Sequence, residues 1–151
     1  MSNVADAASN AGAGLPKPLT AFLDFVAVTT FLVIGRLNHH HGFDPLSFLQ
    51  AWWPFAVGAA AGWSICYLYS HVRARELLHS DFHPDRMPTG IVVWILTVAV
   101  GMLLRWILHQ GTELSFIIVA TCALGLFFLG WRAIARVVRV RHRAVAAPTT
   151  T

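Results

Sequence analysis

Charged residues are scarce in this chain. Asp, Glu, Lys and Arg make up 12% of its 151 residues, against roughly 25% in an ordinary soluble domain, whereas hydrophobic residues make up 56%. The Leu, Ile, Val, Phe and Trp residues stand in long runs and do not alternate with polar residues. This composition argues against an ordinary soluble domain and indicates a membrane protein of one domain with little extramembrane mass.

Cysteines and catalytic patterns are also few. The two cysteines, Cys66 and Cys122, lie inside apolar runs, so we expect them to pack as small hydrophobic side chains and not to form a disulfide framework. The sequence has no paired acids in the middle of an apolar run, no recognisable Ser-His-Asp set and no Gly-rich phosphate loop. We therefore assign no catalytic residue and no cofactor, and whether the protein is an enzyme stays open.

Four apolar segments follow an N-terminal tail rich in Ala, Gly, Ser and Asn. They cover residues 19–37, 48–69, 90–108 and 114–131. Each has about 18 to 22 residues, enough to cross a hydrocarbon core of roughly 30 Å as a helix. Short links join the first segment to the second and the third to the fourth, so each pair is expected to form an antiparallel hairpin. The sequence thus predicts an all-α, integral membrane four-helix bundle.

The positions of Lys and Arg predict how this bundle is oriented. Nine of the 11 lie in the N-terminal tail, the middle loop and the C-terminal tail, and the other two, Arg36 and Arg105, lie on the opposite side. Because the basic side faces the cytoplasm, we expect a cell-membrane protein with both termini cytoplasmic. The expected domains are a disordered tail at 1–18, a four-span membrane domain at 19–138 and a basic, disordered tail at 139–151.

The sequence also contains an internal repeat, visible in the stretches RLNHHHGFDPLSF and RWILHQGTELSF. Aligning residues 36–63 with 105–131, with one gap opposite Pro45, gives eight identities where ordinary composition would give about two by chance. The identical pairs are Arg36/Arg105, His40/His109, Gly42/Gly111, Leu46/Leu114, Ser47/Ser115, Phe48/Phe116, Gly62/Gly130 and Trp63/Trp131. We therefore predict two tandem, parallel-repeat hairpins related by a pseudo-twofold axis along the membrane normal.

Several of these motifs resemble a known family. GRLNHHHG after the first segment, WPFAVGAAAGW in the second, GMLLR at the end of the third and SFIIVAT…GWRAIAR in the fourth are similar to domain of unknown function family 3054, a four-helix membrane family. The resemblance covers about residues 19–136. It implies a small integral membrane protein without an assigned activity, and it supplies no catalytic or binding residue.

Arg36 and Arg105 are the most informative charged residues. Each is followed eight residues later by an acid, Asp44 or Glu113. In one interpretation each Arg reaches the membrane interface and pairs with an acid or with helix carbonyls. In the other, the twofold axis brings both guanidinium groups into one outward-facing vestibule that binds an anion or a lipid phosphate.

Histidines add a second group of candidates. His40 and His109 are equivalent in the repeat, and each could join its local Arg and acid in binding a phosphate ester or could simply help to cap a helix. Imidazole and carboxylate groups also suit Zn²⁺, but their spacing here fits no fixed metal motif, so no metal is assigned. The two clusters are His39, His40 and His41 with Asp44, and His79, Asp81, His83 and Asp85.

Asp24 lies five residues into the first apolar segment, about 7 Å from its start at about 1.5 Å per residue. A carboxylate there could line a water-filled proton or ion path. Alternatively, it sits at the cytoplasmic interface and pairs with Lys17 or with an Arg of the middle loop.

The C-terminal stretch WRAIARVVRVRHR forms a basic helix face. Its members are Arg132, Arg136, Arg139 and Arg143. We expect these side chains to contact anionic inner-leaflet lipids, at about 1 kcal/mol per Arg, or to act only as a topology determinant. Nucleic acid is not expected as a partner.

Three functions stay open at this stage. The first is a small transport or permeation unit, a homodimer, that uses Asp24 and the Arg36/Arg105 vestibule. The second is a structural or accessory subunit whose small-residue faces and basic tail bind a membrane protein partner or anionic lipid. Gly58-x3-Gly62 provides a groove for close helix contact, used either for packing within the bundle or for self-association. The third is a small membrane enzyme acting on a lipid-linked phosphate.

Overall fold

The computed structural model describes residues 15–38, 44–77 and 86–146, with side chains placed for 15–37, 44–72 and 86–141. Four helices occupy this part of the chain: α2 (Lys17–Asn38), α3 (Pro45–Leu77), α4 (Met87–Ile107) and α5 (Leu114–Ala146). Every regular element in these ranges is a helix. The predicted all-α class with four helices is therefore confirmed.

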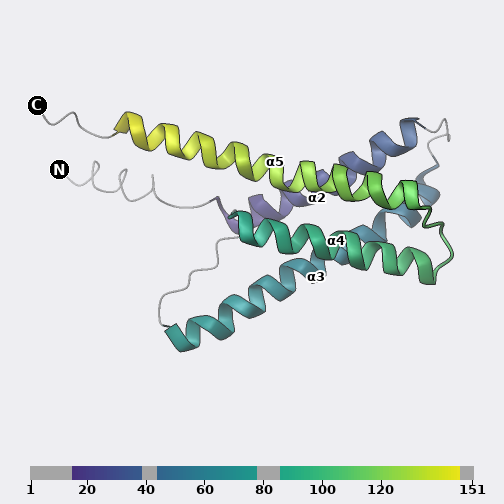
Figure 1. Cartoon of the computed structure of the whole chain (residues 1–151), viewed down its shortest axis with the longest axis horizontal. Helices are drawn as coiled ribbons and strands as arrows, with labels where there is room; N and C mark the ends of the chain where they lie inside the picture. Colours follow the sequence, from purple (N-terminus) through teal and green to yellow (C-terminus); the bar gives the residue numbers. More distant parts are fainter. Residues whose placement is uncertain (1–14, 39–43, 78–85, 147–151) are drawn as a thin grey trace, which may run out of the picture.

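The helices pack as a ring of neighbours (Figure 1). Over the described residues α2 packs against α3 and α5, and α4 also packs against α3 and α5. The diagonal pair α3 and α5 meets through side chains, with the ring centres of Phe55 and Phe116 6.3 Å apart. The ends of α2 and α4 and the starts of α3 and α5 lie at one end of the bundle, which we call the link end. The start of α2 and the end of α5 lie at the other, which we call the terminal end.

Two helix boundaries have clear local causes. At the start of α3 the backbone N–H of Ser47 donates to Oδ2 of Asp44 at 2.9 Å, an N-cap arrangement, and Pro45 is the first helical residue. At the end of α4 the N–H of Gln110 donates to the carbonyl of Arg105 at 2.9 Å, and His109 has a φ of 53°. This is a Schellman-type turn with His where glycine is usual.

The closest packing joins α3 and α4. A Cβ atom on Gly58 would lie 2.7 Å from the carbonyl oxygen of Thr97, and one on Gly62 would lie 2.8 Å from Cα of Val93. Because no side chain separates the two backbones there, the helices approach closely. The predicted use of Gly58 and Gly62 as a packing groove within the bundle is confirmed.

The core is apolar and the outer surface is apolar as well. Phe55, Val93, Leu124 and Phe128 are fully buried between the helices. Many large hydrophobic side chains nevertheless face outward, including Leu126, which is 71% exposed. A protein in water rarely exposes so much apolar surface, whereas a bilayer accommodates it.

Three helices are long and apolar enough to cross a membrane. These candidate spans are Lys17–Leu37, Met87–Ile107 and Leu114–Arg141, as judged over the described residues. No such candidate falls on α3, although residues 48–69 contain no Asp, Glu, Lys or Arg. Its Trp, Gly, Ser and Pro residues have low hydropathy, so the fourth span is supported by its lack of charge and not by its mean hydropathy.

Helices α3 and α5 continue beyond the apolar segments at the terminal end (Figure 1). Helix α5 runs without a break to Ala146, past residue 138, where the C-terminal tail is expected to begin. Residues 132–146 add about 22 Å of helix at a rise of about 1.5 Å per residue. Helix α3 likewise reaches Leu77, past the apolar segment that ends at residue 69.

Candidate functional site

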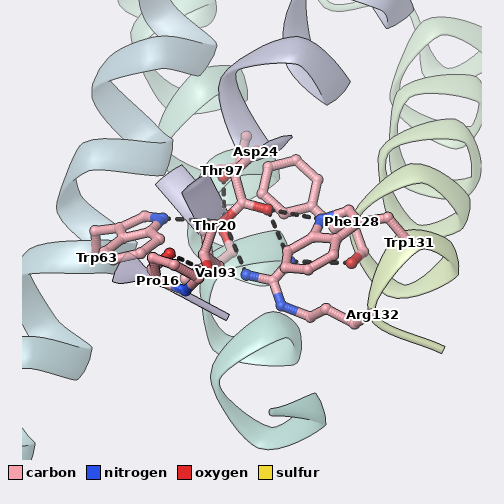
Figure 2. Close-up of polar contacts among 9 residues, drawn as sticks. All are labelled: Pro16, Thr20, Asp24, Trp63, Val93, Thr97, Phe128, Trp131 and Arg132. Carbon is pink, nitrogen blue, oxygen red and sulfur yellow. Dashed lines mark hydrogen bonds and ion pairs between the residues drawn. The ribbon is translucent and has the colours of Figure 1, made fainter. Parts of the chain in front are cut away.

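A buried ion pair lies toward the terminal end of the bundle. Asp24 of α2 is 2% exposed and Arg132 of α5 is fully buried. The guanidinium binds the carboxylate through two bonds, NH1 to Oδ1 at 2.7 Å and NH2 to Oδ2 at 2.8 Å (Figure 2). This bidentate geometry is the strongest form of an Arg–carboxylate contact.

Two indole groups complete the surroundings of this carboxylate. Nε1 of Trp63 donates to Oδ2 of Asp24 and Nε1 of Trp131 donates to Oδ1, each at 3.0 Å. Arg132 also donates to the carbonyl of Phe128 at 3.0 Å and lies 4.3 Å from the centre of the Trp131 ring. The carboxylate thus accepts four hydrogen bonds from α3 and α5, and we call these four residues, Asp24, Trp63, Trp131 and Arg132, the Asp24 cluster.

Helix periodicity explains why these side chains meet. Asp24 lies on the same face of α2 as the buried Val28 and Phe31, and Arg132 follows Leu124 and Phe128 on the buried stripe of α5. Gly90 of α4 makes room for the arginine, since a Cβ atom there would lie 2.5 Å from Cδ of Arg132. Both charges are therefore carried into the core by otherwise apolar helix faces.

Sequence patterns alone did not pair Asp24 with Arg132. Arg132 was expected with the lipid-facing arginines, and the partners considered for Asp24 were Lys17 and the middle loop. The available signal was a lone acid in one apolar segment and an Arg at the end of another. Buried charges in such segments are rare unless they are paired, which could have linked the two. The repeat identity of Trp63 and Trp131 was a second signal.

A cavity of about 480 Å³ lies at the link end. Both candidate arginines line it, together with Glu113, which directly precedes α5. The rest of the wall is mainly apolar and includes Phe31, Leu32, Phe116 and Val119. The structure therefore brings Arg36 and Arg105 to one cavity, and we call it the arginine cavity.

Arg36 is held by the start of α3. Its NH2 group donates to Oγ of Ser47 at 2.6 Å, and its NH1 group reaches the carbonyl of Asp44 at 3.4 Å. The Ser47 N–H bound to the Asp44 carboxylate lowers the pKa of Asp44, with a smaller contribution from the nearby Arg36 charge. Asp44 therefore acts first as a helix cap that fixes Ser47, and through Ser47 it positions Arg36.

Arg105 is held by the turn that follows α4. Its NH2 group donates to the carbonyls of Gln110 at 2.8 Å and Gly111 at 3.2 Å, and its guanidinium stacks over the Phe116 ring at 4.7 Å. Its Nε atom is buried with no hydrogen-bond partner among the described residues. Within the same residues, neither Arg36 nor Arg105 forms an ion pair with a carboxylate.

A smaller hollow of about 260 Å³ adjoins the arginine cavity. Arg105 and Ala51 line both spaces. The rest of the hollow is polar, formed by Ser47, Gln50 and Gln110, and Oε1 of Gln110 is buried without a hydrogen-bond partner in the described part of the chain. Arg105 thus stands between an apolar space and a polar one.

The histidine candidates contribute less to this geometry. His109 is exposed, at the turn after α4. His40 and the other clustered histidines lie outside the described residues. Within the described ranges no group of three His, Cys, Asp or Glu side chains is arranged to hold a metal ion.

The remaining candidate arginines lie on the extension of α5. Arg136 is exposed, and Arg139 is half-buried and donates to the carbonyl of Ala135 at 3.3 Å. The side chain of Arg143 lies outside the described residues. Any lipid contact of this helix face would thus involve Arg136 and Arg139 without Arg132, which is engaged with Asp24.

One family of sequences matches this chain. It is described as Protein of unknown function (DUF3054), and its model matches residues 21–135. The matched range contains both the Asp24 cluster and the arginine cavity. No curated protein and no solved structure matches the chain.

Proposed function

The chain belongs to the Protein of unknown function (DUF3054) family, as its motifs predicted, and because that description assigns no activity we propose one: an integral membrane protein that binds an anionic ligand in the arginine cavity as a transport or permeation unit. The observation that carries the proposal is that Arg36 and Arg105 line one cavity without a carboxylate partner among the described residues. Guanidinium groups recognise phosphate and carboxylate through paired hydrogen bonds.

The proposal includes four membrane spans, with α3 as the fourth. Three helices are apolar enough to span, and α3 packs backbone to backbone against one of them. The excess of Lys and Arg at the terminal end favours a cytoplasmic location for that end in the cell membrane. The arginine cavity would then face the opposite side, away from the cytoplasm.

A tandem arrangement of two hairpins forms part of the proposal. Two repeat-equivalent pairs support it, because Arg36 and Arg105 line one cavity and Trp63 and Trp131 donate to one carboxylate. Parallel repeats of this kind occur in transporters, with binding sites between the halves.

The arrangement of the core suits a site that is open at one end. Going from the arginine cavity toward the terminal end, the fully buried side chains of Leu124 and Phe128 come first, and the Asp24–Arg132 pair follows. Transport would require this ion pair to separate or shift. Asp24 would then form part of a gate, and it would not serve as the proton or ion path that the sequence suggested.

Ligand retention tests the proposal. We would extract the protein from its own membrane in mild detergent and compare native mass spectra of the wild type, Arg36→Ala/Arg105→Ala and the matched control Arg136→Ala/Arg141→Ala. A bound anion present in the wild type and control and lost from the first variant is expected. A wild type without any bound anion, or one that keeps it in the first variant, would overturn the proposal.

The α5 extension supports a second candidate role, that of an accessory subunit. It continues for about four turns beyond the apolar segment and exposes Arg136 and Arg141. This helix would contact anionic headgroups first and then present its basic face to a membrane protein partner. Co-purification that depends on Arg136 and Arg141, with the arginine cavity dispensable, would favour this role.

A further inference from the structure

Resting on the proposed function, we infer that the ligand of the arginine cavity is a glycerophospholipid with a single negative charge and a neutral, hydroxyl-bearing headgroup. The hydrocarbon chain would lie in the arginine cavity, the phosphodiester at Arg36 and Arg105, and the headgroup hydroxyls in the polar hollow beside Arg105. Three independent features of the site support this assignment.

The first feature is the apolar lining of the cavity. Phe31, Leu32, Phe116 and Val119 form much of its wall, and its volume of about 480 Å³ is typical of small-molecule sites. A hydrated inorganic anion gains nothing from such a wall and would lose water on entering it. A hydrocarbon chain gains the burial of its own apolar surface.

The second feature is the lateral position of the cavity. Val119 lines the cavity and is 58% exposed, so the cavity is open to the outside at α5. On the α2 side the lining includes Gly35, and a Cβ atom there would meet nothing within 4 Å. The space between α2 and α5 therefore reaches the bundle surface, where a lipid chain enters without crossing the core.

The third feature is the charge and polarity of the lining. Two guanidinium groups and the Glu113 carboxylate give the cavity a net charge of +1, which a phosphodiester monoanion balances. The polar hollow next to Arg105 presents Ser47, Gln50 and Gln110, and the amide oxygen of Gln110 has no hydrogen-bond partner within the described ranges. Hydroxyl groups donate to that oxygen, whereas the trimethylammonium group of a choline lipid has no proton to donate.

Lipid competition tests the inference. The full-length protein would be delipidated in detergent and offered equal amounts of phosphatidylglycerol and phosphatidylcholine with the same acyl chains, and retained lipid would be counted by native mass spectrometry. We expect the wild type to prefer phosphatidylglycerol by about tenfold or more. Both lipids offer the phosphodiester to the arginines, but phosphatidylcholine lacks the headgroup hydroxyls that would bond in the polar hollow and brings a positive charge close to two guanidinium groups. Leu126→Ala changes an exposed position of α5 that lines neither the arginine cavity nor the polar hollow and should keep this preference, whereas Arg36→Ala/Arg105→Ala should lose it.

Two further variants keep the test decisive if the double alanine variant does not fold. Arg36→Lys/Arg105→Lys preserves the charge but removes bidentate geometry and should reduce the preference. Val119→Trp fills the chain space on the bundle surface and should lower phosphatidylglycerol retention with both arginines intact. Equal retention of the two lipids by the wild type, or an unchanged preference in all the cavity variants, would overturn the inference.

A soluble probe separates this inference from the proposed function. The same proteins would be titrated with glycerol 3-phosphate, which carries the phosphate and hydroxyls without a chain. Arginine-dependent binding of this probe with no lipid preference would overturn the inference and leave the proposed anion site standing. If neither the lipid nor the soluble probe binds, both fail.

Discussion

At the scale of single residues, the Asp24 carboxylate shows how a charge is kept in an apolar core. Removing an ion pair from water is costly, and breaking a buried pair costs more than replacing both partners. Here each carboxylate oxygen accepts one guanidinium and one indole hydrogen bond. Both carboxylate oxygens thus have two hydrogen-bond donors each, and the main effect of the ion pair is to connect α2 with α3 and α5.

Removal of one partner should expose this cost. Asp24→Leu leaves the Arg132 charge buried without its carboxylate, and we expect a loss of about 3–5 kcal/mol in the free energy of unfolding, measured by denaturant titration in detergent micelles. Asp24→Leu/Arg132→Met should recover much of that loss because no charge remains buried. The control Arg136→Met, on an exposed site, should change little. If Asp24→Leu were as stable as Arg136→Met, the ion pair would have no structural role.

A substitution at His109 should raise the stability of the protein, whereas the substitution at Asp24 should lower it. Its φ of 53° places an L residue in the left-handed region, where strain is roughly 1–2 kcal/mol, and glycine is the usual residue at this point of the turn. His109→Gly should therefore raise the free energy of unfolding by about 1 kcal/mol. If His109 instead served the ligand, the same variant would lose binding while gaining stability, so both quantities should be measured.

The residue scale also shows where sequence reasoning stops. The importance of Asp24, Arg36 and Arg105 followed from their rarity in apolar segments. The partner of Asp24 did not, because it lies 108 residues away and depends on the room that Gly90 leaves for the arginine. No local pattern records which buried faces of α2 and α5 meet.

At the scale of elements, the contact between α3 and α4 depends on missing side chains. The Gly58-x3-Gly62 spacing predicted a close helix contact, but the sequence left open whether the partner was inside the bundle or in another copy. The positions of Val93 and Thr97 answer this, since their backbones lie against the two glycines.

Two glycines that are equivalent in the repeat provide a matched pair of variants. Gly62→Ala would place a Cβ atom 2.8 Å from Cα of Val93, so α3 and α4 must move apart at an expected cost of about 1–3 kcal/mol. Gly130→Ala meets nothing within 4 Å and should be neutral or slightly stabilising. Thermal unfolding of both variants in the same detergent gives the comparison, and equal effects would argue against the close α3–α4 contact.

The cap of α3 should respond to pH. The folded-state pKa of Asp44 is lowered below 3.8, chiefly by the Ser47 N–H, so its contribution to stability is complete above that value and is lost as pH falls through the lower folded-state pKa. Asp44→Asn keeps a capping oxygen without the charge. The wild type should therefore lose more stability than this variant between pH 5 and about pH 2, as followed by circular dichroism. If the wild type and Asp44→Asn lost the same stability over this pH range, the capping role of the Asp44 charge would be contradicted.

At the scale of the whole molecule, the apolar segments predicted the helices well. Four long segments with few charged residues predicted four helices, and the described residues form four. Hydropathy alone supports three of them as spans, because Trp, Gly and Pro lower the value for α3. Helix length was less predictable. Helices α3 and α5 continue past the apolar segments as polar turns, and these turns have no periodic hydrophobic pattern to indicate a helix.

The proposed orientation can be checked by labelling. With Cys66 and Cys122 replaced by alanine, His109→Cys marks the link end and Val140→Cys marks the terminal end. A membrane-impermeant maleimide should label the first in intact cells and the second after lysis alone. Labelling of Val140→Cys in intact cells would reverse the proposed topology, and labelling of both would show two orientations.

The Asp24–Arg132 pair also has a consequence for biogenesis. In a chain inserted as the ribosome makes it, the first helix reaches the membrane long before the last. The pair is 108 residues apart, so at about 5–20 residues per second Arg132 is synthesised about 5–20 s after Asp24. During that interval the acid lacks its partner. Its position near the start of α2, on the side proposed to face the cytoplasm, would let it stay hydrated until α5 arrives. Completion of the final helix would then seal the bundle, making correct assembly depend on translation of the whole chain.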